Sequence, residues 1–171
     1  GTLDRLRNFY GQKSFKEEFC VEDEIRNTLA FFGDYVENSN ITIEFHTDKE
    51  HMVKNYKNEL SQTLLSILQN SKEAIETKKG GQGQITIKVY EKNKTIAVSV
   101  VDNGGGMDEK TLHQIFDPYF STKFKTNDVG LGLYLAKVSV EKNMGGRLVA
   151  KKIKDGLEMV IELPSPLNDA I

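Results

Sequence analysis

The segment VVDNGGGM, residues 100–107, places an aspartate and three consecutive glycines directly after an alternating apolar run that is typical of a β-strand. The carboxylate of Asp102 can accept a hydrogen bond from an exocyclic amine, a contact that would select adenine over guanine. The glycines that follow leave backbone room for a flat ligand. The same residues also suit a tight turn, because Asn and Gly tolerate a positive φ and close hairpins easily. For this segment alone the turn is the favoured interpretation, so the binding hypothesis depends on the rest of the chain.

A second polar group suited to ligand chemistry is Asn70, within the strongly periodic segment 58–78 that predicts a long helix. A side-chain amide oxygen suits magnesium, which takes few protein ligands and completes its octahedron with water and phosphate oxygens. Three more polar residues share its flank of the apolar stripe: Ser66, Glu73 and Thr77. Polar groups at such an edge can face a cleft while the helix stays anchored. A solvated flank would show the same pattern, and for Asn70 by itself it is the favoured interpretation.

Two glycines, Gly130 and Gly132, stand immediately before another predicted helix. Backbone N–H groups at such a helix start can approach an anion, which the positive helix end then stabilises. A mobile hinge is the alternative for a Gly-x-Gly sequence. Lys123 and Lys125 would add positive charge near a terminal phosphate, although two lysines in a loop are also typical of a solvated surface.

The composition is that of an ordinary globular domain, with 171 residues, 38% hydrophobic and 28% charged, and a formal net charge of -2. This charge shows no basic footprint for nucleic acid, and no apolar run approaches the roughly 18 residues of a membrane span. The single cysteine, Cys20, cannot form an internal disulfide and indicates a reducing compartment, so we expect a cytoplasmic location. The start at Gly1 and Thr2, without a methionine, suggests a piece of a longer polypeptide.

Periodicity along the chain predicts an α+β sandwich with one sheet and with helices on one of its faces. Helices are expected around 25–36, 58–78, 108–115 and 131–142, and the first should bury Ile25, Leu29, Phe32, Tyr35 and Val36. Strands are expected at 41–45, 85–89, 96–102, 147–153 and 157–163, with weaker signals at 19–21 and 52–53. Turns at 91–94 and 154–156 make antiparallel hairpins of the strands that flank them.

Four motifs follow one another along the chain: LLSILQNSKEAI (64–75), DNGGGM (102–107), IFDPYFST (115–122) and VGLGLYLAK (129–137). In this order they resemble the N, G1, F and G2 boxes of the ATP-binding catalytic domain of sensor histidine kinases, within the gyrase, Hsp90, histidine kinase and MutL superfamily. Each motif is weak alone, and the four in sequence with compatible spacing are strong. The resemblance covers about residues 15–163, nearly the whole chain.

The resemblance implies a Bergerat-type fold, a two-layer sandwich in which three helices cover one face of a mixed, largely antiparallel sheet. It places the ATP-binding domain at residues 15–171 and assigns residues 1–14 to the end of a dimerisation and phosphotransfer helix with its linker. ATP and Mg²⁺ are the implied ligands. Residues from about 107 to 129 would form a lid that is mobile or altered without nucleotide.

The resemblance also implies a role for single residues in this sequence. Asn70 would bind the magnesium ion, and Asp102 would contact the adenine amine. Lys123, in a Ser-Thr-Lys sequence, would reach the γ-phosphate and act with Asn70 in catalysis. The other implied nucleotide contacts lie in the same motifs: Gly104, Gly106 and Met107 beside the base and sugar, Phe116, Phe120 and Thr122 in the F box and lid, and Gly130, Leu131, Gly132 and Leu133 beside the phosphates.

The chain departs from the family pattern near Asn70. Position 66, four residues earlier, holds a serine where the gyrase and Hsp90 branches place a glutamate that activates water. Serine cannot act as that base at neutral pH without help, so we expect poor hydrolysis and phosphoryl transfer to a partner nucleophile. Ser71 replaces the alanine usually found after the asparagine, a change that we expect to be tolerated.

The three histidines, His46, His51 and His113, lie outside any phosphoacceptor sequence, and each is expected to be solvent-exposed. The acceptor histidine would then belong to a phosphotransfer and dimerisation domain elsewhere in the same protein. That domain and a downstream response regulator are the implied partners, in a homodimeric parent that could be membrane-anchored.

Two other functions stay open. A related protein serine kinase of the same superfamily would share the nucleotide site, and its product would be an acid-stable phosphoserine. A module that has kept the fold but lost catalysis would act through protein contacts, and would fail to bind magnesium and ATP at millimolar concentration. The intact motif residues argue against this second alternative.

Overall fold

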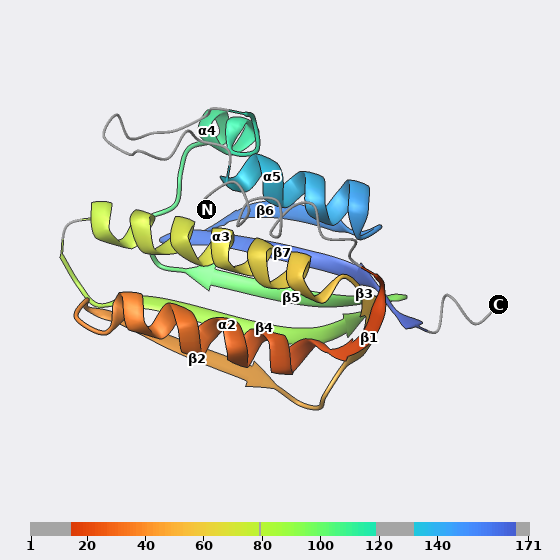
Figure 1. Ribbon diagram of the computed structural model, residues 1–171. Coiled ribbons are helices and arrows are strands. Elements are labelled where there is room, and N and C mark those ends of the chain that lie inside the picture. Colours follow the sequence, from red (N-terminus) through yellow and green to blue (C-terminus); the bar gives the residue numbers. More distant parts are fainter. Residues whose placement is uncertain (1–14, 79, 119–131, 167–171) are drawn as a thin grey trace, which may run out of the picture.

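The computed structural model describes residues 15–78, 80–118 and 132–166, and its centre is a five-stranded sheet (Figure 1). The strands are β2 (Ile41–Thr47), β4 (Gly83–Lys92), β5 (Thr95–Asp102), β6 (Arg147–Ile153) and β7 (Gly156–Pro164), in the order β2-β4-β5-β7-β6. Strand β2 pairs with β4 in parallel, and the other three pairs are antiparallel. The prediction of a mixed, largely antiparallel sheet is confirmed.

Three helices, α2 (Val21–Val36), α3 (Lys57–Thr77) and α5 (Gly132–Val138), lie on one face of this sheet in Figure 1. Helix α5 continues into a π-helical turn, η1 (Ser139–Asn143). A short helix, α4 (Glu109–Gln114), follows β5, and its N-cap Asp108 accepts a hydrogen bond from the Thr111 N–H at 2.7 Å, as its sequence predicts. The two-layer α+β sandwich expected from the sequence is therefore confirmed.

Helix α3 is held against the sheet by an apolar stripe. Leu60, Ile67 and Leu68 are fully buried, and Leu64 is 1% exposed. Burying each such side chain contributes about 1.5–3 kcal/mol, so hydrophobic packing fixes the orientation of the helix on the sheet. The sheet supplies the other half of the core through alternate residues, including Ile85, Ile87, Val98, Val100 and Ile161.

A separate two-stranded sheet pairs β1 (Glu17–Cys20) with β3 (Met52–Asn55) in antiparallel register, at the two weaker strand signals. It brings His51 against the start of α2, where the Glu22 carboxylate is fully buried. Glu22 Oε1 accepts a hydrogen bond from the His51 backbone N–H at 2.6 Å, and Oε2 lies 2.7 Å from His51 Nδ1. The predicted exposure of His51 is wrong, because this pairing leaves the residue 3% exposed. His46 and His113 are exposed, as predicted.

The predicted apolar face of α2 is correct at Ile25, Phe32 and Val36, which are buried, and wrong at Tyr35, which is 58% exposed. Tyr35 lies at the edge of the stripe and packs edge-on against Phe31, with ring centroids 5.4 Å apart. An aromatic pair on the helix surface removes part of its apolar area from water without entering the core.

None of the helices in the described ranges has the length and apolar character needed to cross a lipid bilayer. The expectations for residues 1–14 and for positions 119–129 of the lid lie outside the described residues.

Candidate functional site

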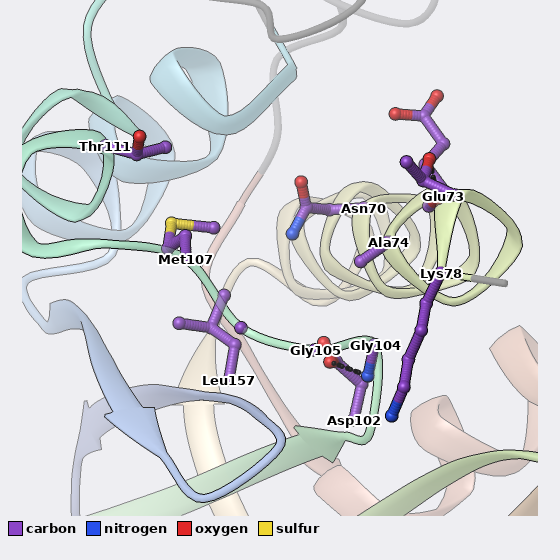
Figure 2. A pocket seen from close by; sticks show the side chains of 12 residues that line it. Asn70, Glu73, Ala74, Lys78, Asp102, Gly104, Gly105, Met107, Thr111 and Leu157 are labelled. Atoms are coloured by element: carbon purple, nitrogen blue, oxygen red, sulfur yellow. Dashed lines mark hydrogen bonds between the residues drawn. The ribbon is translucent and has the colours of Figure 1, made fainter.

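A cavity of about 380 Å³ lies between α3, the loop after β5, the start of β7 and helix α4 (Figure 2). Its volume falls within the range of small-molecule sites. The lining residues are Asn70, Glu73, Ala74, Thr77, Lys78, Asp102, Gly104, Gly105, Gly106, Met107, Thr111 and Leu157. The structure thus brings five of the predicted ligand-binding residues to one cavity: Asn70, Asp102, Gly104, Gly106 and Met107.

Asp102 ends strand β5 and is only 3% exposed. Its Oδ1 accepts a hydrogen bond from the Gly104 backbone N–H at 2.9 Å, so this segment does form a tight turn. Burial raises the pKa of the Asp102 carboxyl, and hydrogen bonds from the Gly104 N–H, the Ser71 hydroxyl and the Leu157 N–H oppose part of that rise. The turn and the binding interpretations are compatible, because one carboxylate both closes the turn and lines the cavity.

Helix α3 and the loop after Asp102 are in direct contact at Gly104. A Cβ atom at position 104 would lie 2.6 Å from the Ala74 Cβ and 2.9 Å from the Ala74 carbonyl carbon, which is too close for any larger residue. This contact holds the helix that carries Asn70 against the loop that follows Asp102.

The polar flank of α3 faces the cavity for most of its length. Asn70, Glu73 and Thr77 line the cavity, whereas Ser66 is absent from its lining. Figure 2 shows Asn70 and Ala74 directed from α3 toward Met107 and Leu157. The solvated-flank interpretation is therefore incomplete: this flank borders a concave site.

The wall opposite α3 includes Leu157, which the sequence analysis did not single out. Leu157 follows the β6–β7 turn and pairs with Asp102 across the sheet. The Gly105 N–H donates to the Asp155 carbonyl of the same turn at 2.9 Å. Sequence reasoning missed Leu157 because β7 lies more than 50 residues after β5 and their register is set only in the folded sheet. The turn signal at 154–156 identified the β6–β7 hairpin, but it did not indicate that β7 pairs with β5.

Three other lining residues were also missed: Ala74, Lys78 and Thr111. Gly105, which also lines the cavity, belongs to the glycine run after Asp102 that the sequence did single out. Ala74 and Lys78 stand inside or beside the first motif, and their spacing from Asn70 is the signal that could have found them. Thr111 belongs to α4, and the sequence carries no signal for its position at the cavity.

Several predicted contacts do not line the cavity or lie outside the described residues. Phe116 packs against the core, with its ring centroid 4.7 Å from Lys137 Nζ. Gly132 and Leu133 begin α5, where Leu133 packs against the core. The remaining predicted contacts, Phe120, Thr122, Lys123, Gly130 and Leu131, together with Lys125, fall within 119–131, outside the described residues.

The described residues fit an adenine nucleotide and a magnesium ion. Met107 and Leu157 offer apolar surface to a flat ring, and the buried Asp102 carboxylate offers an acceptor to an amine. Asn70 offers the oxygen donor that magnesium prefers. The glycines at 104–106 contribute backbone to the lining of the cavity.

Comparisons with known proteins agree with this fold and site. The family model described as histidine kinase-, DNA gyrase B-, and HSP90-like ATPase matches residues 55–167, more than half of the chain. The chain is 28% identical to sporulation kinase B of Bacillus subtilis over 152 residues, which cover 89% of this chain and 34% of that protein. It thus spans about a third or less of the length of the first curated relatives that it matches.

Solved structures of histidine kinases share the fold. The nucleotide-free catalytic domain of histidine kinase ThkA superposes with a TM-score of 0.78 at 28% identity, covering 88% of this chain and 95% of that one. Histidine kinase ThkA in complex with response regulator protein TrrA gives a TM-score of 0.76 at 26% identity, covering 98% of this chain and 49% of that one.

A helix-covered mixed sheet with an amide and a buried carboxylate at one cavity defines a nucleotide-binding domain of the histidine kinase catalytic type. The chain belongs to the family of histidine kinase-, DNA gyrase B- and HSP90-like ATPases.

Proposed function

We propose that this chain is the ATP-binding catalytic domain of a two-component sensor histidine kinase. It would transfer the γ-phosphate of ATP to a histidine on a phosphotransfer domain outside this sequence. The observation that carries the proposal is the convergence of Asn70, on α3, and Asp102, at the end of β5, on one cavity. An amide oxygen and a buried carboxylate, with apolar surface between them, match the two ends of a magnesium-bound adenine nucleotide.

Asp102 selects the base. Its carboxylate accepts a hydrogen bond from the exocyclic amine of adenine, whereas guanine presents a carbonyl oxygen at the equivalent position and is repelled. Because Asp102 is 3% exposed, water competes little for this hydrogen bond. Met107 and Leu157 provide apolar contact to the ring.

Asn70 and its surroundings handle the phosphates. The Asn70 side-chain oxygen would hold Mg²⁺, which neutralises phosphate charge when it is bound. Lys123 and the glycine turn at Gly130 and Gly132 are proposed, from the resemblance, to contact the terminal phosphates. Ser66, one turn before Asn70, offers no base at neutral pH, so water is poorly activated and an incoming histidine is the better nucleophile.

The proposed partners are the phosphotransfer and dimerisation domain of the same protein and a response regulator. Support comes from the similarity to histidine kinase ThkA, which has been solved in complex with response regulator protein TrrA. A homodimeric parent is proposed with them.

The test combines nucleotide binding with phosphoryl transfer. Calorimetric titration with Mg²⁺ and ATP should show saturable binding below millimolar concentration, and GTP should bind at least about tenfold more weakly. Radiolabelled ATP together with a histidine phosphotransfer domain, supplied as a separate chain, should give a protein label that acid removes and base preserves. An acid-stable label would instead identify a serine kinase, and the absence of ATP binding would identify a silent module.

A further inference from the structure

Asn103 follows Asp102 directly, and the hydrogen bonds of its side chain run to the sheet. Its Oδ1 accepts from the Gln84 backbone N–H at 2.8 Å, and its Nδ2 donates to the Gln82 carbonyl at 2.8 Å. The Asn103 backbone N–H also donates to the Gln84 carbonyl, at 3.2 Å. Three hydrogen bonds from one residue thus tie the chain just after Asp102 to the start of β4, and Asn103 is absent from the cavity lining.

The backbone carbonyl of Asn103 contacts the residue that follows helix α3. Lys78, immediately after α3, donates from its Nζ to the Asn103 carbonyl at 3.2 Å. In Figure 2 the Lys78 side chain runs down from the helix toward the loop that carries Gly104 and Asp102. Asn103 therefore bridges the two elements that carry the proposed ligand groups, because β5 ends at Asp102 and α3 bears Asn70.

We propose that Asn103 is a positioning residue that sets the selectivity for adenine over guanine, by fixing the Asp102 carboxylate relative to α3. This inference rests on the proposed function, since it assigns a residue to the recognition of the base at that site. Selectivity depends on the carboxylate lying where it meets an amine but not a carbonyl oxygen. Displacing a hydrogen-bonding group by about 1 Å weakens the favourable contact and also relaxes the repulsion.

Both atoms of the Asn103 amide are needed for this role. Aspartate has the same shape and keeps an acceptor for the Gln84 N–H, but it places an oxygen against the Gln82 carbonyl where an N–H group now donates. Asn103→Asp therefore exchanges one attraction for a repulsion without creating a cavity. Lys78→Met removes the second connection from an exposed position, where substitution leaves the core untouched.

The experiment measures the dissociation constants of adenosine and guanosine β,γ-imidotriphosphates with Mg²⁺, by calorimetry on the intact chain. For Asn103→Asp we expect adenosine binding about tenfold weaker and guanosine binding unchanged within about twofold, so that the selectivity ratio falls about tenfold. For Lys78→Met we expect the selectivity ratio to fall about threefold. Hydrogen exchange at the Gly104 amide should become faster in both variants.

Two controls separate positioning from general loss of stability. Asn93→Asp makes the same chemical change in the turn between β4 and β5, at the far end of the same hairpin, and should leave the ratio unchanged. Ile25→Val, on the buried face of α2, should lower stability without changing the ratio. Equal weakening of the binding of both nucleotides by Asn103→Asp would overturn the proposal. If Asn103→Asp fails to fold, an unchanged selectivity ratio in Lys78→Met would overturn it instead. Failure of the unaltered chain to bind the adenosine nucleotide would refute the proposed function instead.

Discussion

Gly156, at the start of β7, packs directly against the backbone carbonyl of Asp102, and any Cβ atom at position 156 would overlap that oxygen. The β6–β7 turn and the end of β5 therefore meet without a side chain between them. This contact brings Leu157 to the cavity beside Asp102.

Gly156→Ala should destabilise the chain by about 3 kcal/mol or more, because the methyl group can be accommodated only by backbone movement. Urea denaturation followed by circular dichroism measures the loss. The matched control is Gly33→Ala in α2, where an added Cβ meets no atom within 4 Å and should stabilise the helix by about 0.5–1 kcal/mol. Equal effects of the two substitutions would contradict the packing argument.

Asp102→Ala should abolish nucleotide binding, with the dissociation constant for ATP rising by about a hundredfold or more, because the buried acceptor for the adenine amine is lost. Calorimetry or competition with a fluorescent ATP analogue provides the measurement. Asp34→Ala, an exposed aspartate on α2, serves as the control and should bind normally. An Asp102→Ala protein that bound ATP as tightly as the original would remove the proposed adenine contact.

The stability of the nucleotide-free chain should depend on the protonation of Asp102. Burial raises the pKa of this carboxyl in the folded state. Its contribution to stability is therefore fully present below the unfolded-state pKa of about 3.9 and is lost as the pH rises through the folded-state pKa. Asp102→Asn, which does not titrate, should gain stability relative to the original chain between pH 4 and 7. A difference in unfolding free energy that stayed constant over this range would refute the prediction.

Asn70→Ala should remove the magnesium-dependent part of ATP affinity and the phosphoryl transfer, while metal-free adenosine binding persists, because Asp102 and the apolar wall are unchanged. Titrations with and without Mg²⁺ separate the two contributions. Gln69→Ala changes the exposed neighbour of Asn70 and should leave both the magnesium-dependent and the metal-free affinity unchanged. Undiminished phosphorylation by the Asn70→Ala protein would count against the ligand assignment.

His51→Ala should destabilise the chain by about 3 kcal/mol, because the buried Glu22 carboxylate would lose its contact with His51 Nδ1. Replacing both residues by leucine removes the buried carboxylate together with its partner but leaves the backbone N–H of residue 51 without its acceptor, Glu22 Oε1. This double replacement should therefore still destabilise the chain, by less than His51→Ala, because an unpaired neutral N–H costs less than an unpaired buried carboxylate. His46→Ala, at an exposed position, should change stability by less than about 0.5 kcal/mol. Thermal unfolding of the unaltered chain and the three variants measures these differences in stability. A His51→Ala protein as stable as the His46→Ala protein would contradict the stabilising role of the pair.

The sequence alone was sufficient to predict the main helices and strands and the family to which the chain belongs. The periodicity of α3 was predicted within a residue at each end, as 58–78 against Lys57–Thr77, and β5 was correctly ended at Asp102. These properties are local: helical and strand spacing, turn residues and short motifs appear in consecutive residues. Local information by itself favoured a turn at Asp102 and a solvated flank at Asn70, and the resemblance of the four motifs in order predicted that both belong to one site.

Only the tertiary structure decided which distant residues meet. The burial of His51 depends on the pairing of β1 with β3, and the place of Leu157 depends on the register of β7 against β5. The proposed role of Asn103 likewise depends on hydrogen bonds to the start of β4, almost 20 residues earlier in the chain. Such contacts are set by how elements pack and slide into register, and one residue of slippage would reverse every side chain of a strand. Local spacing predicts the elements of this protein, and long-range packing determines how its site is assembled.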